Sequence, residues 1–323
     1  MNDLHAGDRA LNDVLKRLDR LYAAPRAKCD EILAGYLKPK LKALQPRKNE
    51  KASDYRMRVM RAFSGLKWRL ARRKIATAFT DADIKASELI NDNLEWAFND
   101  GMNESAYCLA LNGVKSWPIT LSIVSTLVIT GAITLKKRTL KRSQDAEYNE
   151  DKAQSAVNSA IMRGISPEKL PEEVSRKISS IRQNETISVA RAMIYGASDS
   201  GAYMAGLEAQ KMGIDVEKTW LGIMDMRIRP SHKHLHGETI PLDGVFHGYH
   251  GDLRYPHDPL AHPAEIYRCR CRMAVHVAGK APGEYSRRIL PSQTSAYKEW
   301  RAARIREAGS ELELLKLHKR LVR

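Results

Sequence analysis

Residues 220–271 read WLGIMDMRIRPSHKHLHGETIPLDGVFHGYHGDLRYPHDPLAHPAEIYRCRC. Seven of the ten histidines lie in this stretch, between His232 and His262, and it ends in a Cys-Arg-Cys triplet. Short β-like runs separated by Gly, Pro and Asp predict strands joined by turns, and these runs lie at 219–224, 238–242 and 272–277. The stretch therefore predicts a compact module with a small sheet, dense in charged and metal-binding side chain types.

Outward from this stretch, the apolar spacing is that of amphipathic helices. Helices are expected at 8–24, 27–44, 52–78, 81–112, 144–163, 184–212 and 295–322, with breaks at Pro25 and Pro39. The predicted fold class is α+β: a long, mainly helical N-terminal part, a compact α+β C-terminal module and a basic helical tail. The predicted segments are a helical, basic region 1–115, a helical connection 116–183, the module 184–278 and the tail 279–323.

The chain is strongly basic, with a formal net charge of +16 and a pI near 9.7 over 323 residues. Such an excess indicates a polyanionic partner. The window 36–75 holds 14 Lys and Arg residues against two acids, with Tyr55, Phe63 and Trp68 interleaved. One interpretation is a surface facing nucleic acid, formed by Arg56, Arg58, Arg61, Lys67, Arg69, Arg72, Arg73 and Lys74. The other is the solvated face of amphipathic helices whose aromatic residues lie in the core.

Four cysteines in 323 residues do not form a disulfide framework. Cys29 and Cys108 have apolar, helix-like surroundings and are expected to be buried thiols. The polar N-terminus has no apolar segment typical of a signal peptide. The apolar run 119–135 is short for a membrane span and contains six hydroxyl side chains. We therefore interpret this run as a buried element of the fold.

Nucleotide-binding and hydrolase motifs are missing from the sequence, which has no Walker loop, Gly-x-Gly-x-x-Gly or nucleophile elbow. This argues against a packaging ATPase. Asp225, Arg227 and Arg229 alternate and would share a face on an extended chain, with His232 close behind. The four are either a hydrogen-bonded clamp that pins a loop or an active site in which Asp or His acts as acid and base and Arg binds an anion.

Cys269 and Cys271 are candidate zinc ligands, because Cys and neutral His are the ligands that structural zinc prefers. On a strand, both thiols would point to one side. The candidate set is Cys269, Cys271, His232 and His236, with other histidines of the stretch as substitutes. The histidine spacing matches no standard finger, so packing without metal is the competing interpretation.

In this order, the motifs resemble the phage Mu F-like family of minor head proteins, also called phage head morphogenesis proteins. The matching positions are Arg191, Trp220, Asp225, Arg227, Arg229, His232, Gly237, Pro256, Asp258, Pro259, Cys269, Arg270 and Cys271. Three places depart from the family pattern. Ala192-Met193 replaces Thr-Glu, His257 replaces the Gly of a Pro-Gly-Asp-Pro-like turn, and Arg268 replaces the Asn before Cys-Arg-Cys.

The resemblance implies a minor capsid protein of a tailed bacteriophage, made in the host cytoplasm and placed inside the head near the portal. The implied partners are portal protein, other head proteins and packaged double-stranded DNA, contacted through the basic helical region, and not a membrane. The implied roles are head assembly and DNA packaging or ejection, with no established catalytic activity and no certain cofactor. The alternatives kept open are a small nuclease-like or transferase-like enzyme using Asp225, Arg227, Arg229 and His232, and a zinc-stabilised DNA-binding protein.

Overall fold

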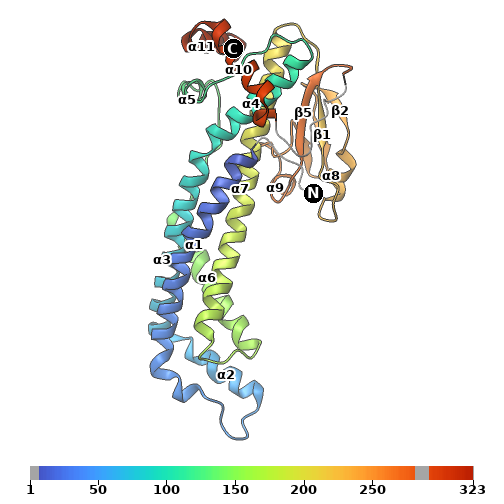
Figure 1. Ribbon diagram of the computed structural model, residues 1–323. Coiled ribbons are helices and arrows are strands. Elements are labelled where there is room, and N and C mark those ends of the chain that lie inside the picture. The colour runs from blue at the N-terminus through green and yellow to red at the C-terminus, as the bar shows by residue number, and fades with distance from the viewer. Residues whose placement is uncertain (1–6, 281–290, 323) are drawn as a thin grey trace. The chain divides into compact units, whose positions relative to one another are not determined.

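The computed structural model describes residues 7–280 and 291–322, and it confirms the α+β class (Figure 1). The polar residues 1–6 and most of the loop expected after Gly279 lie outside the described residues. The helices are α1 Asp8–Leu37, α2 Ala52–Ala62, α3 Gly65–Asp92, α4 Leu94–Leu111, α5 Leu121–Ile129, α6 Arg142–Met162, α7 Leu170–Lys211, α8 Pro230–Leu235, α9 Pro263–Ile266, α10 Ser295–Ala308 and α11 Glu311–Val322. The strands are β1 Val216–Leu221, β2 Thr239–Pro241, β3 Phe246–Gly248, β4 Gly251–Leu253 and β5 Arg272–Val277. Three 3₁₀ turns, η1 Lys38–Lys40, η2 Lys42–Leu44 and η3 Pro291–Gln293, complete the elements.

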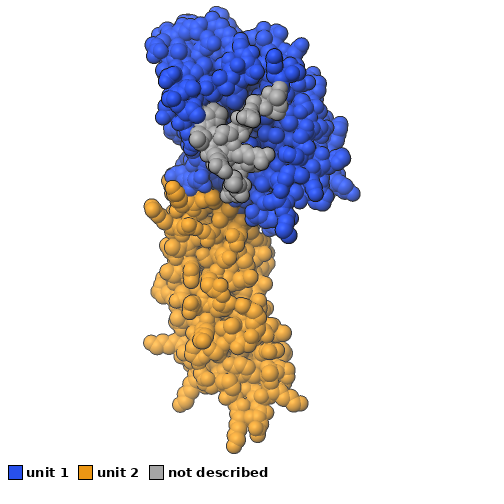
Figure 2. All heavy atoms as spheres, turned by 45° about the vertical axis from the view of Figure 1, so that its right-hand side comes forward, with its two compact units in different colours: residues 1–14, 90–137, 188–323 blue, residues 15–89, 138–187 orange. Residues whose placement is uncertain are grey.

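Two compact units divide the chain, and each is discontinuous in sequence (Figure 2). Unit 1 comprises residues 1–14, 90–137 and 188–323, and unit 2 comprises residues 15–89 and 138–187. Long helices pass from one unit into the other, so each unit combines separate parts of the chain. The units therefore do not coincide with the four consecutive segments predicted from the sequence.

Unit 2 is helical, and its helices differ from the expected ones at their ends. Helix α1 continues through Pro25, where a break was expected, and ends just before Pro39. The helix expected over 52–78 is instead divided at Gly65, whose φ of 76° is left-handed and favours glycine. Tyr36, Phe63 and Trp68 then pack together, with ring centroids 5.0–5.6 Å apart.

A buried polar network joins the helices of unit 2. The Asp83 carboxylate accepts hydrogen bonds from Arg182 at 2.6 and 3.1 Å, from Tyr22 and from Asn149. Asp83 is fully buried and Arg182 is 5% exposed. The partners of Asp83 lie in α1, α6 and α7, far away in sequence.

The core of unit 1 joins α4, α5, the end of α7 and the sheet. Phe98, Ile123, Leu127, Ala205 and Val275 are among its buried members. Helix α5 occupies nine residues of the apolar run 119–135. One face of α5, with Ile123, Val124 and Leu127, lies in this core, whereas Ile129 at its end is exposed. The run is therefore part of the fold, as interpreted, but it is buried on one side only. None of the helices in the described ranges combines the length and apolar character that crossing a bilayer requires.

Glycines allow α4 and α7 to pack closely. A Cβ at Gly201 would collide with the backbone of Phe98 and Met102, and one at Gly101 with the backbone of Ser198. Only hydrogen fits at these crossings, so the glycines set the separation of the two helices.

An antiparallel sheet with strand order β2-β1-β5 forms the centre of the predicted module, and β3 pairs with β4. The register places Trp220 opposite Met273 and Thr219 opposite Thr239 and Ala274. All residues of β5 from Met273 to His276 are buried. The strand is therefore covered on both sides, although apolar Met273, Val275 and Val277 alternate in it with Arg272, Ala274 and His276.

The tail forms two helices, α10 and α11, separated at Gly309, whose φ is 79°. His318 of α11 is buried, with Nδ1 2.7 Å from the Glu208 carboxylate and Nε2 3.1 Å from the Pro118 carbonyl. Both ring nitrogens can donate only when the imidazole is charged. The Glu208 carboxylate outweighs the opposing effect of burial and raises the pKa of His318.

Candidate functional site

The segment after β1 forms a turn that Asp225 organises. Its Oδ1 accepts a hydrogen bond from the Arg227 backbone at 2.9 Å, and its carbonyl accepts one from Ile228 at 3.2 Å. Both carboxylate oxygens are 2.7 Å from the Arg270 guanidinium. These hydrogen bonds from Arg270 hold the pKa of Asp225 well below its usual range. The bidentate pair fixes this turn to the chain just before β5.

The expectation that Asp225, Arg227 and Arg229 share a face on an extended chain is wrong. The Asp225 side chain bonds to the backbone two residues ahead and bends the chain into a turn. Arg229 donates instead to the carbonyls of Glu265, at 2.9 Å, and Tyr267. The Arg227 side chain is 78% exposed.

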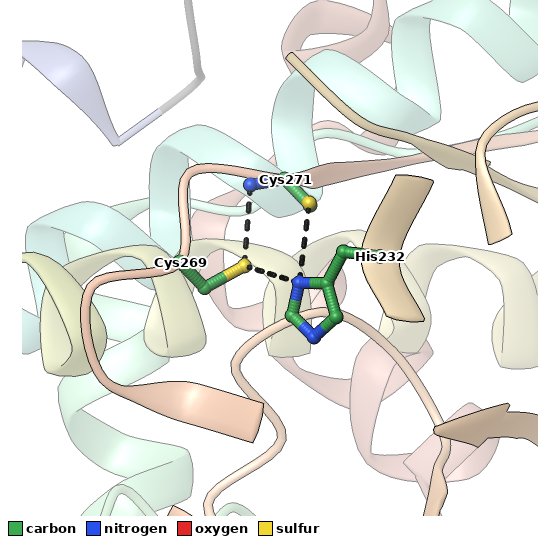
Figure 3. A group of neighbouring side chains, drawn as sticks. All are labelled: His232, Cys269 and Cys271. Atoms are coloured by element: carbon green, nitrogen blue, oxygen red, sulfur yellow. Dashed lines mark hydrogen bonds between the residues drawn. The ribbon is translucent and has the colours of Figure 1, made fainter. Parts of the chain in front are cut away.

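His232 lies at the centre of a buried group with the two cysteines (Figure 3). Its Nδ1 is 3.3 Å from Cys269 Sγ and 3.5 Å from Cys271 Sγ. Its Nε2, on the other side of the ring, is 2.7 Å from the Glu265 carboxylate. The ring packs edge-on against Trp220, with centroids 5.2 Å apart. Trp220 thus supports the histidine from β1, and Glu265 from α9.

The thiols differ in their electrostatic surroundings. Burial raises the pKa of the Cys269 thiol. The hydrogen bond to Cys269, aided by His232, lowers the pKa of the Cys271 thiol.

The other candidate ligand, His236, does not lie in this group. Its Nδ1 accepts a hydrogen bond from the Gly222 backbone at 3.1 Å. Elsewhere in the stretch, His247 pairs with Asp252, and His250 stacks on His262. Several histidines of the stretch were candidate ligands, but His232 is the histidine that lies beside the two thiols among the described residues.

A second clamp lies in the turn at 256–259. The Asp258 carboxylate accepts two hydrogen bonds from the Arg254 guanidinium, each of 2.8 Å, and one from the Leu260 backbone. His257 has a φ of 60° and Arg268 one of 63°, both left-handed. Gly and Asn adopt this conformation more readily than other residues. Two departures from the family pattern thus fall where the backbone favours the family's usual residues.

The basic residues of α2 and α3 divide into two groups. Arg58 is bound by Glu50, with hydrogen bonds of 2.6 and 2.8 Å, and by two backbone carbonyls, and Arg72 lies 3.1 Å from Glu150. Arg56 is half-buried. The exposed members are Arg61, Lys67, Arg69, Arg73 and Lys74. The interleaved Phe63 and Trp68 are buried in the core, so they offer no stacking surface for bases.

Glu265 is the residue of the site that sequence reasoning missed. It is 1% exposed, and it joins His232 to the His250 backbone, whose N–H donates to its second oxygen at 2.8 Å. Its position four residues before Cys269 was the available signal, because histidines that bind metals commonly donate to a nearby carboxylate.

Comparisons with known proteins show similarity to one family and to individual proteins. The family described as Phage Mu protein F like protein matches residues 151–274, from within α6 to within β5. The chain is 21% identical to the minor head protein GP7 of Bacillus phage SPP1, over 66% of this chain and 71% of that protein. It is 28% identical to an NAD(+)–arginine ADP-ribosyltransferase of Enterococcus faecalis, over 51% of this chain and only 34% of that protein. No solved structure matches the chain.

Proposed function

We propose that the chain is a minor head protein of a tailed bacteriophage, because residues 151–274 match the phage Mu F-like family and the chain is similar to a minor head protein. In this proposal the protein lies inside the head near the portal and assists head assembly and DNA packaging or ejection. The observation that carries the proposal is the family match, which encloses the clamped turn, the two cysteines and His232.

The geometry of the charged residues supports a structural role for this region. Both carboxylate oxygens of Asp225 accept hydrogen bonds from Arg270, and Arg229 donates to two backbone carbonyls. Buried or bidentate contacts of this kind fix loops in place.

Incorporation into heads tests the proposal directly. The full chain would be expressed with the portal, scaffolding and major head proteins of the same phage, and proheads would be separated by sedimentation. We expect the protein in proheads, protected from protease and enriched when portal is present. Truncation at residue 180 is a poor test, because it removes parts of both units. Proheads that form normally without the protein bound would overturn the proposal.

For the DNA-facing role, we propose that the exposed residues Arg61, Lys67, Arg69, Arg73 and Lys74 contact phosphates. Each phosphate contact on duplex DNA contributes about 0.9 to the slope of log K against log salt. Replacing all five with Gln should lower that slope by roughly 4 to 5.

A matched control loses the same charge in the same unit. It replaces the exposed α1 residues Lys16, Arg17, Arg20, Arg26 and Lys28, which alternate with acids. The control should retain most of the salt slope. Equal losses in the two variants would show that net charge, and not this surface, governs binding.

The alternative is an enzyme that uses Asp225, Arg227, Arg229 and His232. The partial similarity to the ADP-ribosyltransferase favours its transferase-like form, whereas the nuclease-like form rests on these four residues alone. The alternative is tested by incubating the full chain with NAD⁺ and arginine peptides, or with DNA and RNA plus Zn²⁺ or Mg²⁺. Product formation that disappears in Asp225→Asn and His232→Ala would favour the enzyme over the structural proposal.

A further inference from the structure

We propose that His232, Cys269 and Cys271 bind a zinc ion through Nδ1 and the two sulfurs, with the fourth position open to a small cavity edged by arginines. The three ligand atoms lie within 4.8 Å of one another, and all three residues are buried. This inference does not depend on the role in the phage head.

The distances fit tetrahedral zinc. With Zn–N of about 2.0 Å and Zn–S of about 2.3 Å, tetrahedral angles place nitrogen and sulfur about 3.5 Å apart. The observed separations from Nδ1 are 3.3 and 3.5 Å. Both sulfurs lie on the Nδ1 side of the ring, as Figure 3 shows, so one ion can contact all three atoms without a rotation of the imidazole.

Glu265 sets the imidazole tautomer that a metal requires. Its carboxylate, 2.7 Å from Nε2, favours a proton on that nitrogen and leaves the Nδ1 lone pair directed at the sulfurs. The His250 backbone holds the other carboxylate oxygen in place at 2.8 Å. A carboxylate behind a histidine ligand is the usual support of a zinc site. Packing of two thiols against a ring would not by itself require this carboxylate.

The fourth position has room for a water molecule. A cavity of about 10 Å³ is lined by the three ligand residues and by Arg227, Arg229, Arg268 and Arg270, with Ile223 and Ile228. That volume holds roughly one water. Two thiolates and a neutral imidazole would balance the charge of Zn²⁺, so the arginines would face a neutral centre. Three protein ligands and one water form an accepted zinc coordination.

Ligand chemistry selects zinc over the harder cations. Thiolate and imidazole favour zinc, whereas calcium and magnesium prefer oxygen ligands. The ion would connect α8, which carries His232, to the segment before β5. The buried apolar cluster there has only six members: Trp220, Leu235, Phe246, Leu253, Cys269 and Cys271. A metal would therefore add a large share of the stability of this small core.

The test uses the full chain purified without chelator, with zinc measured by mass spectrometry and cobalt(II) exchanged in for spectroscopy. We expect about one zinc per chain, and cobalt bands typical of a tetrahedral site with thiolate ligands. Cys269→Ser and Cys271→Ser should lose the metal and these bands. Cys29→Ser, at an equally buried thiol elsewhere, and His236→Ala should retain both.

Glu265→Gln keeps the shape of the side chain and tests the site if a ligand variant fails to fold. It should weaken zinc binding about 10- to 100-fold in a competition with a chromogenic chelator, while the circular dichroism spectrum is unchanged. Wild-type protein that takes up neither zinc nor cobalt after reconstitution would overturn the proposal. So would zinc that persists at full occupancy in both cysteine variants.

Discussion

The buried ion pair between Asp83 and Arg182 allows a quantitative prediction of how a substitution changes the stability of unit 2. Changing Arg182 to Met removes a guanidinium that donates two hydrogen bonds to a fully buried carboxylate. Breaking a buried ion pair on one side typically costs about 3–5 kcal/mol, because it leaves an uncompensated charge. Asp83 retains its bonds from Tyr22 and Asn149. The positive charge of Arg138 also acts on Asp83. We therefore expect the lower end, about 3 kcal/mol.

The double variant Asp83→Asn with Arg182→Met separates the cost of a stranded charge from the value of the pair. With both charges gone, the loss should fall to about 1 kcal/mol or less. Hydrogen exchange of peptides from 65–89 and 170–187 measures the opening free energy of unit 2 locally. Arg176→Met, which removes an exposed pair of α7, is the control and should leave exchange nearly unchanged.

A cost of less than about 1 kcal/mol for Arg182→Met would contradict the prediction, because a fully buried carboxylate that loses its cation should destabilise unit 2 by more. A double variant as unstable as the single one would show that the stranded charge of Asp83 is not the cause.

The remaining predictions concern unit 1, the helix α1 and the turn before β5. The pKa of His318 is raised beside Glu208, so the charged imidazole stabilises the folded state. This stabilisation is fully present below pH 6.5 and is lost as the pH rises through the raised pKa. Hydrogen exchange of α11 that does not change with this loss would contradict the prediction. Gly201→Ala should cost about 1–3 kcal/mol by urea unfolding, because its Cβ meets the α4 backbone. Gly35→Ala, in open space within α1, should stabilise by about 0.5–1 kcal/mol, and equal effects at the two glycines would refute close packing as the cause. Arg268→Asn should stabilise the protein by up to about 1 kcal/mol, and so raise its melting temperature, because the φ of 63° at this position is left-handed and Asn adopts it more readily than Arg. A lower melting temperature would show that Arg268 is not strained.

Local patterns predicted most of the secondary structure. The strands at 239–241 and 272–277 lie within or match the expected runs, and Gly213 ends α7 with a φ of 81°. Pro25 did not end α1, although proline removes one helical hydrogen bond and crowds the preceding turn. Tertiary burial overrides this local cost: Pro25 and nearby Tyr22 and Cys29 are all buried.

Long-range pairing could not be read from the sequence. Asp83 and Arg182 are 99 positions apart, and no periodicity links them. The same limit applied to the module, where seven histidines were candidates for partners of the cysteines. The short helix α8 determines which histidine reaches the thiols. It directs His232 toward them, whereas His236 lies just after the end of α8 and accepts a hydrogen bond from Gly222.

The residues that carry the family resemblance divide by the work they do in this fold. Asp225 with Arg270, Arg229 with two carbonyls, and Asp258 with Arg254 all fix loops, while Trp220 fills the core. The departures at His257 and Arg268 fall at left-handed φ, so they too concern backbone geometry. Structural tasks thus account for Asp225, Arg229, Asp258 and Arg270, but loop fixation does not require two buried thiols facing one imidazole. The zinc ion that we propose would give a physical reason for His232, Cys269 and Cys271 to lie together.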